Sequence, residues 1–293
     1  MKVVFCNDDF GISYGFTKGI SECFLKGVTT STAICVNGNA YTYAVKLLKS
    51  KLKKINVGLH LNLDYGKTTT KELQNKEGKY KFTFFKYLIF LKLCNKSLLR
   101  SLGKDLDYQF KKVITDNLNI TFVNGHDHIY MIPPIFEIVC KLCKKYGIKY
   151  IRLPREPYYF THNVKQDLKI IFSPNIIKFF LLNKYSKKNY DVMKKYNLKT
   201  TDAFYGVLYT QHMNTSTIMA ALSNARLNNY QHIEILGHPA NINDRSDAIY
   251  ETKAYEKFAK SKRRIIEKKA FQSSVLKKMI RDKKLEPISF NNL

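Results

Sequence analysis

The sequence predicts an α/β fold in which mostly parallel strands close into a distorted, TIM-like (β/α) barrel. Short runs rich in Val, Ile, Leu, Phe or Tyr alternate with helical patterns over most of the 293 residues, which is typical of a parallel sheet. The chain has no Gly/Ser linker and no internal repeat, so its length favours one closed domain covering residues 1–293. Carboxylates and histidines follow several strand-like runs, where such folds place active sites.

The expected strands share short length, β-branched or aromatic residues and a loop-forming end. They are predicted at residues 3–6, 31–36, 56–63, 120–124, 149–153 and 233–236, with a last one at 288–290. Helices are predicted at 15–26, where Gly27 ends the pattern, and at 40–53, where apolar residues recur at helical spacing. The clearest helix opens at Pro133-Pro134, has lysines in its last turns and stops at Gly147.

Two segments interrupt this rhythm, and both mix Phe and Leu with Lys. They cover residues 82–99 and 170–190, within insertions expected near 70–110 and 158–200. One interpretation is helices that pack on the barrel. The other is a basic, aromatic surface that docks on a membrane or covers an apolar substrate. The Lys- and Arg-rich stretch from Lys253 to Lys284 has helical spacing and is interpreted as a solvated helix face.

The composition is strongly basic, with 50 Lys and Arg against 23 acidic residues and a formal charge of +27. Such a charge favours a nucleic acid or an anionic membrane as partner, although a Lys-rich genome would give the same excess. The chain starts directly in a strand and has no apolar run of signal-peptide or membrane-spanning length, so a cytoplasmic protein is expected. Cys140 and Cys143 lie within a helical pattern and are interpreted as reduced core thiols.

Four short motifs at strand ends carry the chemistry: Asn7-Asp8-Asp9-Phe10-Gly11, Gly58-Leu59-His60, Asn124-Gly125-His126-Asp127-His128 and Gly237-His238-Pro239. Adjacent carboxylates on an extended chain point in different directions, so one can hold a metal while the other acts as a base. The two histidines of the third motif share one face of an extended segment, so one can ligate while the other supports it or contacts substrate.

Each motif also has a structural interpretation. The Asp8-Asp9 pair precedes a helix and fits an N-cap, and His60 between two leucines fits a satisfied core residue. The joint pattern is more specific than its parts. Two carboxylates and three or four imidazoles are enough for one divalent metal, a general base and a general acid. The residues therefore predict a metal-dependent hydrolase.

These motifs resemble the YdjC-like carbohydrate deacetylases, which include chitooligosaccharide deacetylase, and the resemblance runs from Asn7 to Phe290. Gly27-Val28-Thr29-Thr30-Ser31-Thr32 belongs to it as well. A narrower resemblance, to the branch associated with hopanoid biosynthesis, rests on Val123 to His126, Tyr146 to Ile148, Arg152 to Pro157, Thr201 to Gly206 and His212-Met213. The wider family often has Asp in place of Asn124 and His in place of Tyr130.

The resemblance implies a distorted barrel related to polysaccharide deacetylases, with one divalent metal ion held by Asp9, His60 and His126. The family's usual metal is Mg²⁺. Two imidazoles and one carboxylate would by themselves suggest Zn²⁺ or another transition metal, so the identity of the ion stays open.

The activity it implies is removal of the N-acetyl group from an N-acetylglucosamine-type sugar, soluble or lipid-linked. In the mechanism we expect, Asp8 is the general base, His238 protonates the leaving amine, and Arg152 orients Asp8 or binds substrate. His128, Asn124 and His212 are the candidates for substrate binding.

Two other functions are weighed against this one. A basic metal-dependent phosphodiesterase or nucleic-acid-binding protein would use the charge of +27 directly. An inactive relative that binds glycan without cleaving it would not need the complete ligand set. We expect a carbohydrate substrate, no nucleic acid, peripheral contact with the anionic inner leaflet if the glycan is lipid-linked, and a homodimer by analogy with relatives.

Overall fold

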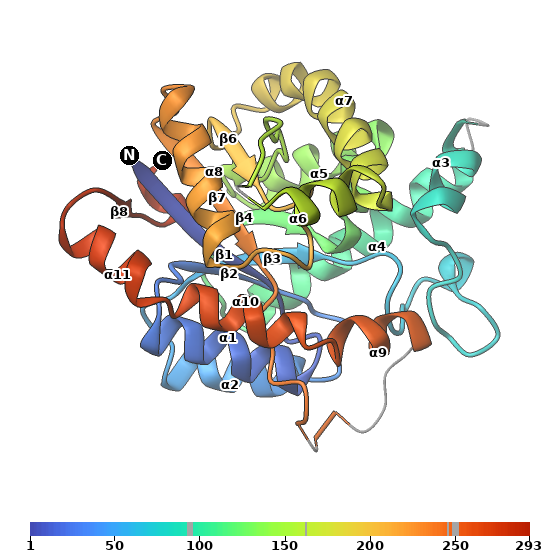
Figure 1. Ribbon diagram of the computed structural model, residues 1–293. Helices are drawn as coiled ribbons and strands as arrows, with labels where there is room; N and C mark the ends of the chain where they lie inside the picture. The colour runs from blue at the N-terminus through green and yellow to red at the C-terminus, as the bar shows by residue number, and fades with distance from the viewer. Residues whose placement is uncertain (93–95, 162, 245, 248–251) are drawn as a thin grey trace.

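The computed structural model describes residues 1–92, 96–161, 163–244, 246–247 and 252–293 (Figure 1). Residues 93–95 of the first interrupting segment, and residue 162 of the insertion expected near 158–200, therefore lie outside the described residues. The strands are β1 (Lys2–Phe10), β2 (Ser31–Ile34), β3 (Asn56–Leu61), β4 (Ile120–Gly125), β5 (Tyr150–Ile151), β6 (Ala203–Tyr205), β7 (His232–Gly237) and β8 (Glu286–Pro287).

The α-helices alternate with these strands for most of the chain. They are α1 (Tyr14–Lys26), α2 (Tyr41–Ser50), α3 (Phe84–Lys92), α4 (Lys96–Thr115), α5 (Pro133–Lys145), α6 (Val164–Ile171), α7 (Pro174–Lys195), α8 (Thr215–Leu227), α9 (Lys253–Ala259), α10 (Arg263–Phe271) and α11 (Ser274–Arg281). Short 3₁₀ helices are η1 (Lys71–Leu73), η2 (His126–Met131) and η3 (Phe290–Asn292). Residues 82–99 and 170–190 thus contribute to α3, α4, α6 and α7.

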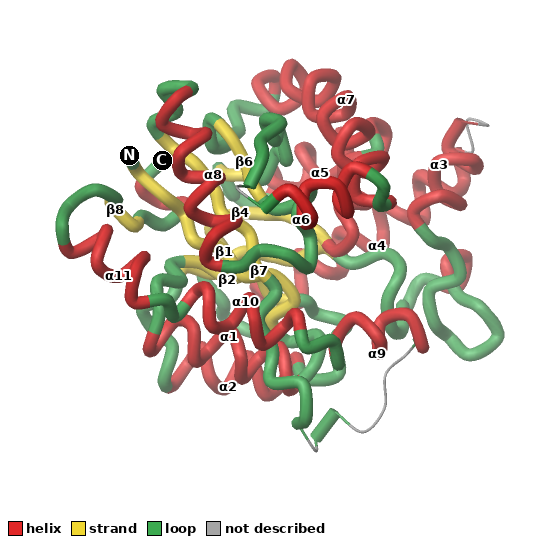
Figure 2. The backbone as a smooth tube through the Cα atoms, in the orientation of Figure 1, coloured by secondary structure: helices red, strands yellow, loops and turns green. Residues whose placement is uncertain are grey.

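All the described strand pairs are parallel, and the sheet runs in the order β5-β4-β3-β2-β1-β7-β6. The short β8 pairs with Lys2 and Val3 at the start of β1, beyond the stretch that β2 covers. Figure 2 shows the strands gathered at the centre with helices around them. This arrangement confirms the predicted α/β barrel class.

The sheet curls until its two edge strands approach each other. Ile151 donates its N–H to the carbonyl of Lys199 at 3.0 Å, and Phe204 donates to the carbonyl of Arg155 at 3.0 Å. The first bond joins β5 to the chain before β6, and the second joins β6 to the chain after β5. Because neither bond belongs to a regular ladder, the closure is distorted.

Side chains alternate between the inside of the barrel and the helices outside, as the period of two in a strand requires. Along β1, Val3 and Phe5 belong to the large core beneath the helices, while Val4 and Cys6 belong to a second, smaller cluster. The smaller cluster fills the lower part of the barrel interior and consists of Val4, Cys6, Ala33, Phe122, Tyr150, Ile288 and Phe290.

The end of the chain supplies part of this interior cluster. Phe290 stacks on Phe122 with ring centroids 3.9 Å apart, and both rings are fully buried. The predicted strand at 288–290 is therefore wrong in its position. The strand is Glu286–Pro287, and Phe290 begins η3, which turns its ring into the space beside Phe122.

The interpretation of residues 253–284 as a solvated helix face is wrong for α10. Arg264 and Glu267 on this helix are fully buried, although the segment is rich in Lys and Arg. The helix packs against α1 and α8 at the outside of the barrel. Within the described ranges, no helix combines the length and apolar character needed to span a bilayer.

The close packing of the Phe122 ring against Gly58 of β3 leads to a prediction about stability. A Cβ at Gly58 would lie 2.5 Å from the Phe122 ring, which Phe290 holds from its other side. We expect Gly58→Ala to lower the free energy of unfolding by about 1–3 kcal/mol through overpacking. Urea denaturation followed by circular dichroism measures this change.

Gly103→Ala is the matched control, because its Cβ would meet nothing nearer than an Ile138 methyl group at 3.9 Å. Since Gly103 lies inside α4, this change should raise the free energy of unfolding by about 0.5–1 kcal/mol. Equal effects of the two substitutions would contradict the packing described for Phe122.

Candidate active site

A layer of polar side chains lies above the apolar cluster inside the barrel. Its members point inward from β1, β3, β4 and β7 and from the residue that follows β5, and each is at most 2 % exposed. They are Asp8, His60, Asn124, Arg152 and Glu234. Because they occupy the next inward positions after Cys6, Phe122 and Tyr150, the strand period explains why they meet at the carboxyl end of the barrel.

Arg152 links two of the carboxylates in this layer. Its Nη1 and Nη2 donate to Asp8 Oδ2 and Oδ1 at 2.5 and 2.9 Å, and its Nε donates to Glu234 Oε1 at 2.8 Å. Burial opposes the ionisation of Asp8, but the guanidinium outweighs it and lowers the pKa of Asp8 to about 2. Burial raises the pKa of Glu234 despite the same partner. Arg152 thus orients an ionised Asp8.

Asn124 connects Asp8 to His60. Its Nδ2 donates to Asp8 Oδ1 at 2.9 Å, and its Oδ1 lies 2.8 Å from His60 Nδ1. An amide oxygen accepts a hydrogen bond, so this contact selects the His60 tautomer that carries its proton on Nδ1. His60 Nε2 is then left with a lone pair.

A bulge in β1 brings Asp9 to the same place. The pairing of β1 with β2 shifts register between Asn7 and Phe10, and Asp9 has a φ of 70°. In a regular strand, Asp9 would point away from the side on which Asp8 lies. The bulge re-aims it, so the two carboxylates contact different partners, as expected, but reach the same end of the barrel.

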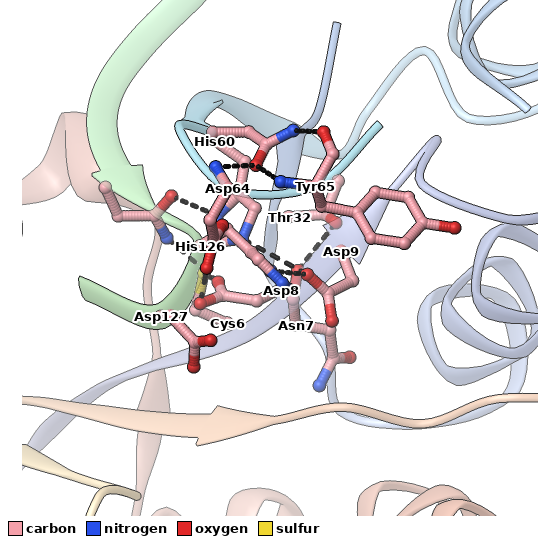
Figure 3. Close-up of polar contacts among 12 residues, drawn as sticks. Cys6, Asn7, Asp8, Asp9, Thr32, His60, Asp64, Tyr65, His126 and Asp127 are labelled. Carbon is pink, nitrogen blue, oxygen red and sulfur yellow. Dashed lines mark hydrogen bonds and ion pairs between the residues drawn. The ribbon is translucent and has the colours of Figure 1, made fainter. Parts of the chain in front are cut away.

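Asp9, His60 and His126 form a buried cluster with the geometry of a metal site. Asp9 Oδ1 lies 3.2 Å from His60 Nε2 and 2.9 Å from His126 Nδ1, and one donor atom from each residue lies within 4.8 Å of the others. Figure 3 shows Asp8, Asp9, His60 and His126 converging.

The donors of this cluster fit a divalent cation. Asp9 Oδ2 and His60 Nε2 are buried and have no hydrogen-bond partner among the described residues. Burial disfavours a charged His126, yet the Asp9 carboxylate raises the pKa of that imidazole to about 10. Orphaned donors in a region of negative potential are what a metal ion would satisfy.

His128 differs from the prediction for the two-histidine motif. Asp127 and His128 have φ values of 49° and 56°, so the segment is a tight left-handed turn within η2 and the predicted extended segment is wrong. His128 is buried, its ring packs edge-on against Phe204 at 6.0 Å, and its Nδ1 has no partner in the described chain. Burial lowers the pKa of His128 well below its usual range.

His238 lies beside the cluster on the loop after β7. Its backbone N–H donates to Glu267 Oε2 at 2.7 Å, and its Nδ1 lies 3.9 Å from the same oxygen. Arg264 Nη1 donates to the His238 carbonyl at 3.1 Å, and its Nη2 pairs with Glu267 Oε1 at 3.1 Å. The side chain of His238 is 15 % exposed, and burial lowers its pKa.

His212 lies in the loop between β6 and α8. Its backbone N–H donates to Tyr209, and its carbonyl accepts from Thr217 Oγ1. Burial, with Arg263 adding to it, lowers the pKa of His212 to about 4.

A pocket of about 440 Å³ opens beside His126. Its lining is largely aromatic, with carboxylates and threonines between the rings: Asp64, Tyr65, Thr83, Phe84, Phe85, His126, Asp127, Thr252, Tyr255 and Phe258. The rings of Tyr65 and Tyr255 lie 4.4 Å apart, and both also contact the His126 ring. A bound molecule would therefore lie against aromatic faces next to the histidine cluster.

The structure brings Asp8, Asp9 and the predicted histidines to one end of the barrel. Asn124 and Arg152 lie at the same end, on the inner side of Asp8. Both are fully buried, and both donate hydrogen bonds to Asp8. The sequence did not lead us to predict a role for Glu234, Arg264 or Glu267. Glu234 gave a signal, since a charge inside Ile233-Glu234-Ile235-Leu236 needs a buried partner. Arg264 and Glu267 gave no such signal, because they lie in a stretch of sequence with many charged residues of the kind usually found on exposed helix surfaces.

The model of the family described as YdjC-like protein matches residues 2–282. A carbohydrate deacetylase of Brevibacillus brevis is 25 % identical over 297 residues, covering 100 % of both chains. A carbohydrate deacetylase of Clostridium beijerinckii is 30 % identical over 178 residues, which covers 59 % of this chain and 69 % of that protein.

A solved structure from Enterococcus faecalis, named as a cellobiose-phosphate cleavage protein, has the same fold. It superposes with a TM-score of 0.70 at 18 % identity and covers 99 % of this chain and 98 % of that one. The family match extends over nearly the whole chain, from β1 to the end of α11. This chain therefore belongs to the YdjC-like family.

Proposed function

We propose that this protein is a metal-dependent hydrolase that removes the N-acetyl group from an N-acetylated amino sugar. The observation that carries the proposal is the buried Asp9–His60–His126 cluster, which lies beside an ionised Asp8 and borders an aromatic pocket. The relatives named carbohydrate deacetylase support the substrate class.

Asp9, His60 and His126 would hold the ion. When bound, a divalent ion would polarise the acetyl carbonyl and lower the pKa of a water molecule, which suits a base as weakly basic as Asp8. The two imidazoles favour Zn²⁺ or another transition metal, whereas the family resemblance favours Mg²⁺.

Asp8 accepts the proton of the attacking water in this mechanism. Arg152 keeps the Asp8 carboxylate ionised between turnovers and fixes the position of its two oxygens. Asn124 contacts both Asp8 and His60 through hydrogen bonds and so fixes these two side chains relative to each other. His238 protonates the departing amine, because its side chain is partly exposed beside the cluster and Glu267 and Arg264 fix its backbone. His128 and His212 remain candidates for sugar contacts.

The pocket distinguishes this proposal from a phosphodiesterase or nucleic-acid-binding function. Aromatic faces such as those of Tyr65 and Tyr255 pack well against the apolar faces of sugar rings. The described residues that line it include no Lys or Arg side chain that would pair with a phosphate group. The excess of lysine therefore lies outside the pocket that a phosphodiester would have to enter.

The first test of the proposal is acetate release from a panel of N-acetylglucosamine compounds, soluble and lipid-linked. We expect release from at least one member, loss of release after treatment with a chelator, and recovery on adding back a divalent ion. Chelator-insensitive release would refute the metal requirement. Cleavage of phosphodiesters without acetate release would favour the alternative function.

The role of Asp8 is tested by Asp8→Asn. Loss of a general base lowers kcat by about 10²–10⁴-fold, while Asp9, His60 and His126 should still bind the ion. Metal content and acetate release are measured on the same sample. Asp282→Asn, an exposed position on the C-cap of α11, is the control and should keep full activity. An Asp8→Asn enzyme with normal kcat would refute the base assignment.

The ligand set is tested by comparing two histidines that lie two positions apart. His126→Ala should lose metal binding, measured as bound Zn²⁺ or Mn²⁺ by isothermal titration calorimetry, because it removes one of three protein donors. His128→Ala should retain metal binding, since its ring packs on Phe204 outside the cluster. Equal loss in both variants would contradict the proposed ligand set.

A further inference from the structure

An exposed apolar face lies on α6 and α7 and on the chain that leads into them. We call it the α6–α7 face, and it consists of Tyr158, Phe160, Val164, Leu168, Phe172, Ile177 and Phe180. Phe172 is 86 % exposed, Val164 is 71 % exposed and Ile177 is 64 % exposed. Single exposed apolar residues are ordinary on protein surfaces, but a contiguous set marks an interaction site.

The members of this face form groups that follow one another along the chain. Val164, Leu168 and Phe172 recur every four residues and so share one side of α6 and its C-cap. Ile177 and Phe180 share one side of α7, which begins directly after that turn. Tyr158 contacts Phe160 at 5.1 Å and the buried Phe179 at 6.0 Å, and Phe179 contacts Phe180 at 5.3 Å.

The core does not require these side chains. Phe179, Leu182 and Met193 on the other side of α7 are the residues that bury it against the protein, and α7 packs on α5 and η2. Both helices are therefore held by one face, and their outer apolar residues are left facing water.

The segment of sequence that carries the face is basic. Between Tyr158 and Lys188 the sequence has Lys165, Lys169, Lys178, Lys184, Lys187 and Lys188. All of these except Lys178 are exposed. Asp167 is the single acid in this stretch of sequence, and it is buried and accepts hydrogen bonds from Thr161 and Tyr209. No exposed carboxylate in the stretch offsets the lysines.

We propose that the α6–α7 face docks on the surface of an anionic lipid bilayer. Its Phe, Val, Leu and Ile side chains would enter the boundary between headgroups and acyl chains, while the surrounding lysines contact anionic headgroups. A second copy of this chain is a poorer occupant, because pairing the face with itself would bring the same lysines together. The net charge of +27 strengthens attraction to an anionic surface.

The docking face lies close to the candidate active site. Lys178 on α7 donates to Asp127 Oδ1 at 2.8 Å, and Asp127 lines the aromatic pocket beside His126. Figure 1 shows α7 at the top of the view, with α1 and α2 at the bottom. Docking would bring the pocket near the membrane surface, but the proposal does not depend on the activity of the pocket.

Co-sedimentation with vesicles tests the proposal directly. The intact protein should bind vesicles of phosphatidylglycerol and phosphatidylcholine, bind pure phosphatidylcholine much more weakly, and lose binding as salt rises. The triple variant Phe172→Ser, Ile177→Ser, Phe180→Ser should bind the anionic vesicles at least about tenfold more weakly, since it removes the inserting side chains. Circular dichroism and thermal melting check that the variant is folded.

Matched variants separate this face from general hydrophobicity and charge. Leu25→Ser, Leu227→Ser, Val275→Ser changes three exposed residues on α1, α8 and α11 and should bind as the unmodified protein does. Lys184→Gln, Lys187→Gln, Lys188→Gln should weaken binding by about a hundredfold at low salt. Lys46→Gln, Lys49→Gln, Lys53→Gln changes the net charge equally and should have a much smaller effect.

Three results would overturn the proposal. These are absence of binding to anionic vesicles, equal binding by the α6–α7 variant and its control, and a dimer in light scattering that the α6–α7 variant converts to a monomer without any vesicle binding. The last outcome would identify the face as a self-association surface.

Discussion

The candidate active site depends on one buried positive charge, the guanidinium group of Arg152. Arg152 is fully enclosed in the barrel and binds both Asp8 and Glu234. Removing a single partner from such an arrangement leaves an uncompensated charge, which typically costs about 3–5 kcal/mol. Asp9 receives no share of the guanidinium and is offset by imidazoles alone. Asp9 lies at the same barrel end beside His60 and His126, where the proposed ion would bind.

Two local features turn a generic barrel into this site. Because side chains alternate along each strand, the residues that face the interior form an apolar layer around Phe122 and a polar layer around Arg152. The same strands therefore supply the packed core and, further along, the residues of the site. The bulge in β1 then adds Asp9, which a regular strand would have turned away. A non-glycine residue at positive φ costs of order 1–3 kcal/mol, and such strain is often found at functional sites.

Much of this could be predicted from the sequence because the signals were local. The positions of Asp8, His60, His126 and His238 in or directly after strands, and the helix opened by Pro133, needed no tertiary information, although β1 continues past the predicted end at Cys6 to Phe10. The left-handed turn at Asp127 and His128, the burial of Arg264 and Glu267, and the turn at Phe290 depend on partners distant in sequence. A Lys-rich segment gives no indication that Glu267 will be buried beside His238 rather than exposed to water. Composition alone does not show which side of a helix packs against the rest of the protein.

The position of β1 has a consequence for how the chain folds. It pairs with β2, which follows closely, but also with β7 and β8, whose partners for Lys2 are His232 and Glu286. The central strand, which carries Asp8 and Asp9, therefore stays half-paired until almost all of the chain has left the ribosome. Pairings this distant make folding slow and expose strand edges in the meantime. The motif that carries Asp8 and Asp9 is made first but is thus among the last to be completed, and production of the protein should benefit from chaperones that shield open sheets.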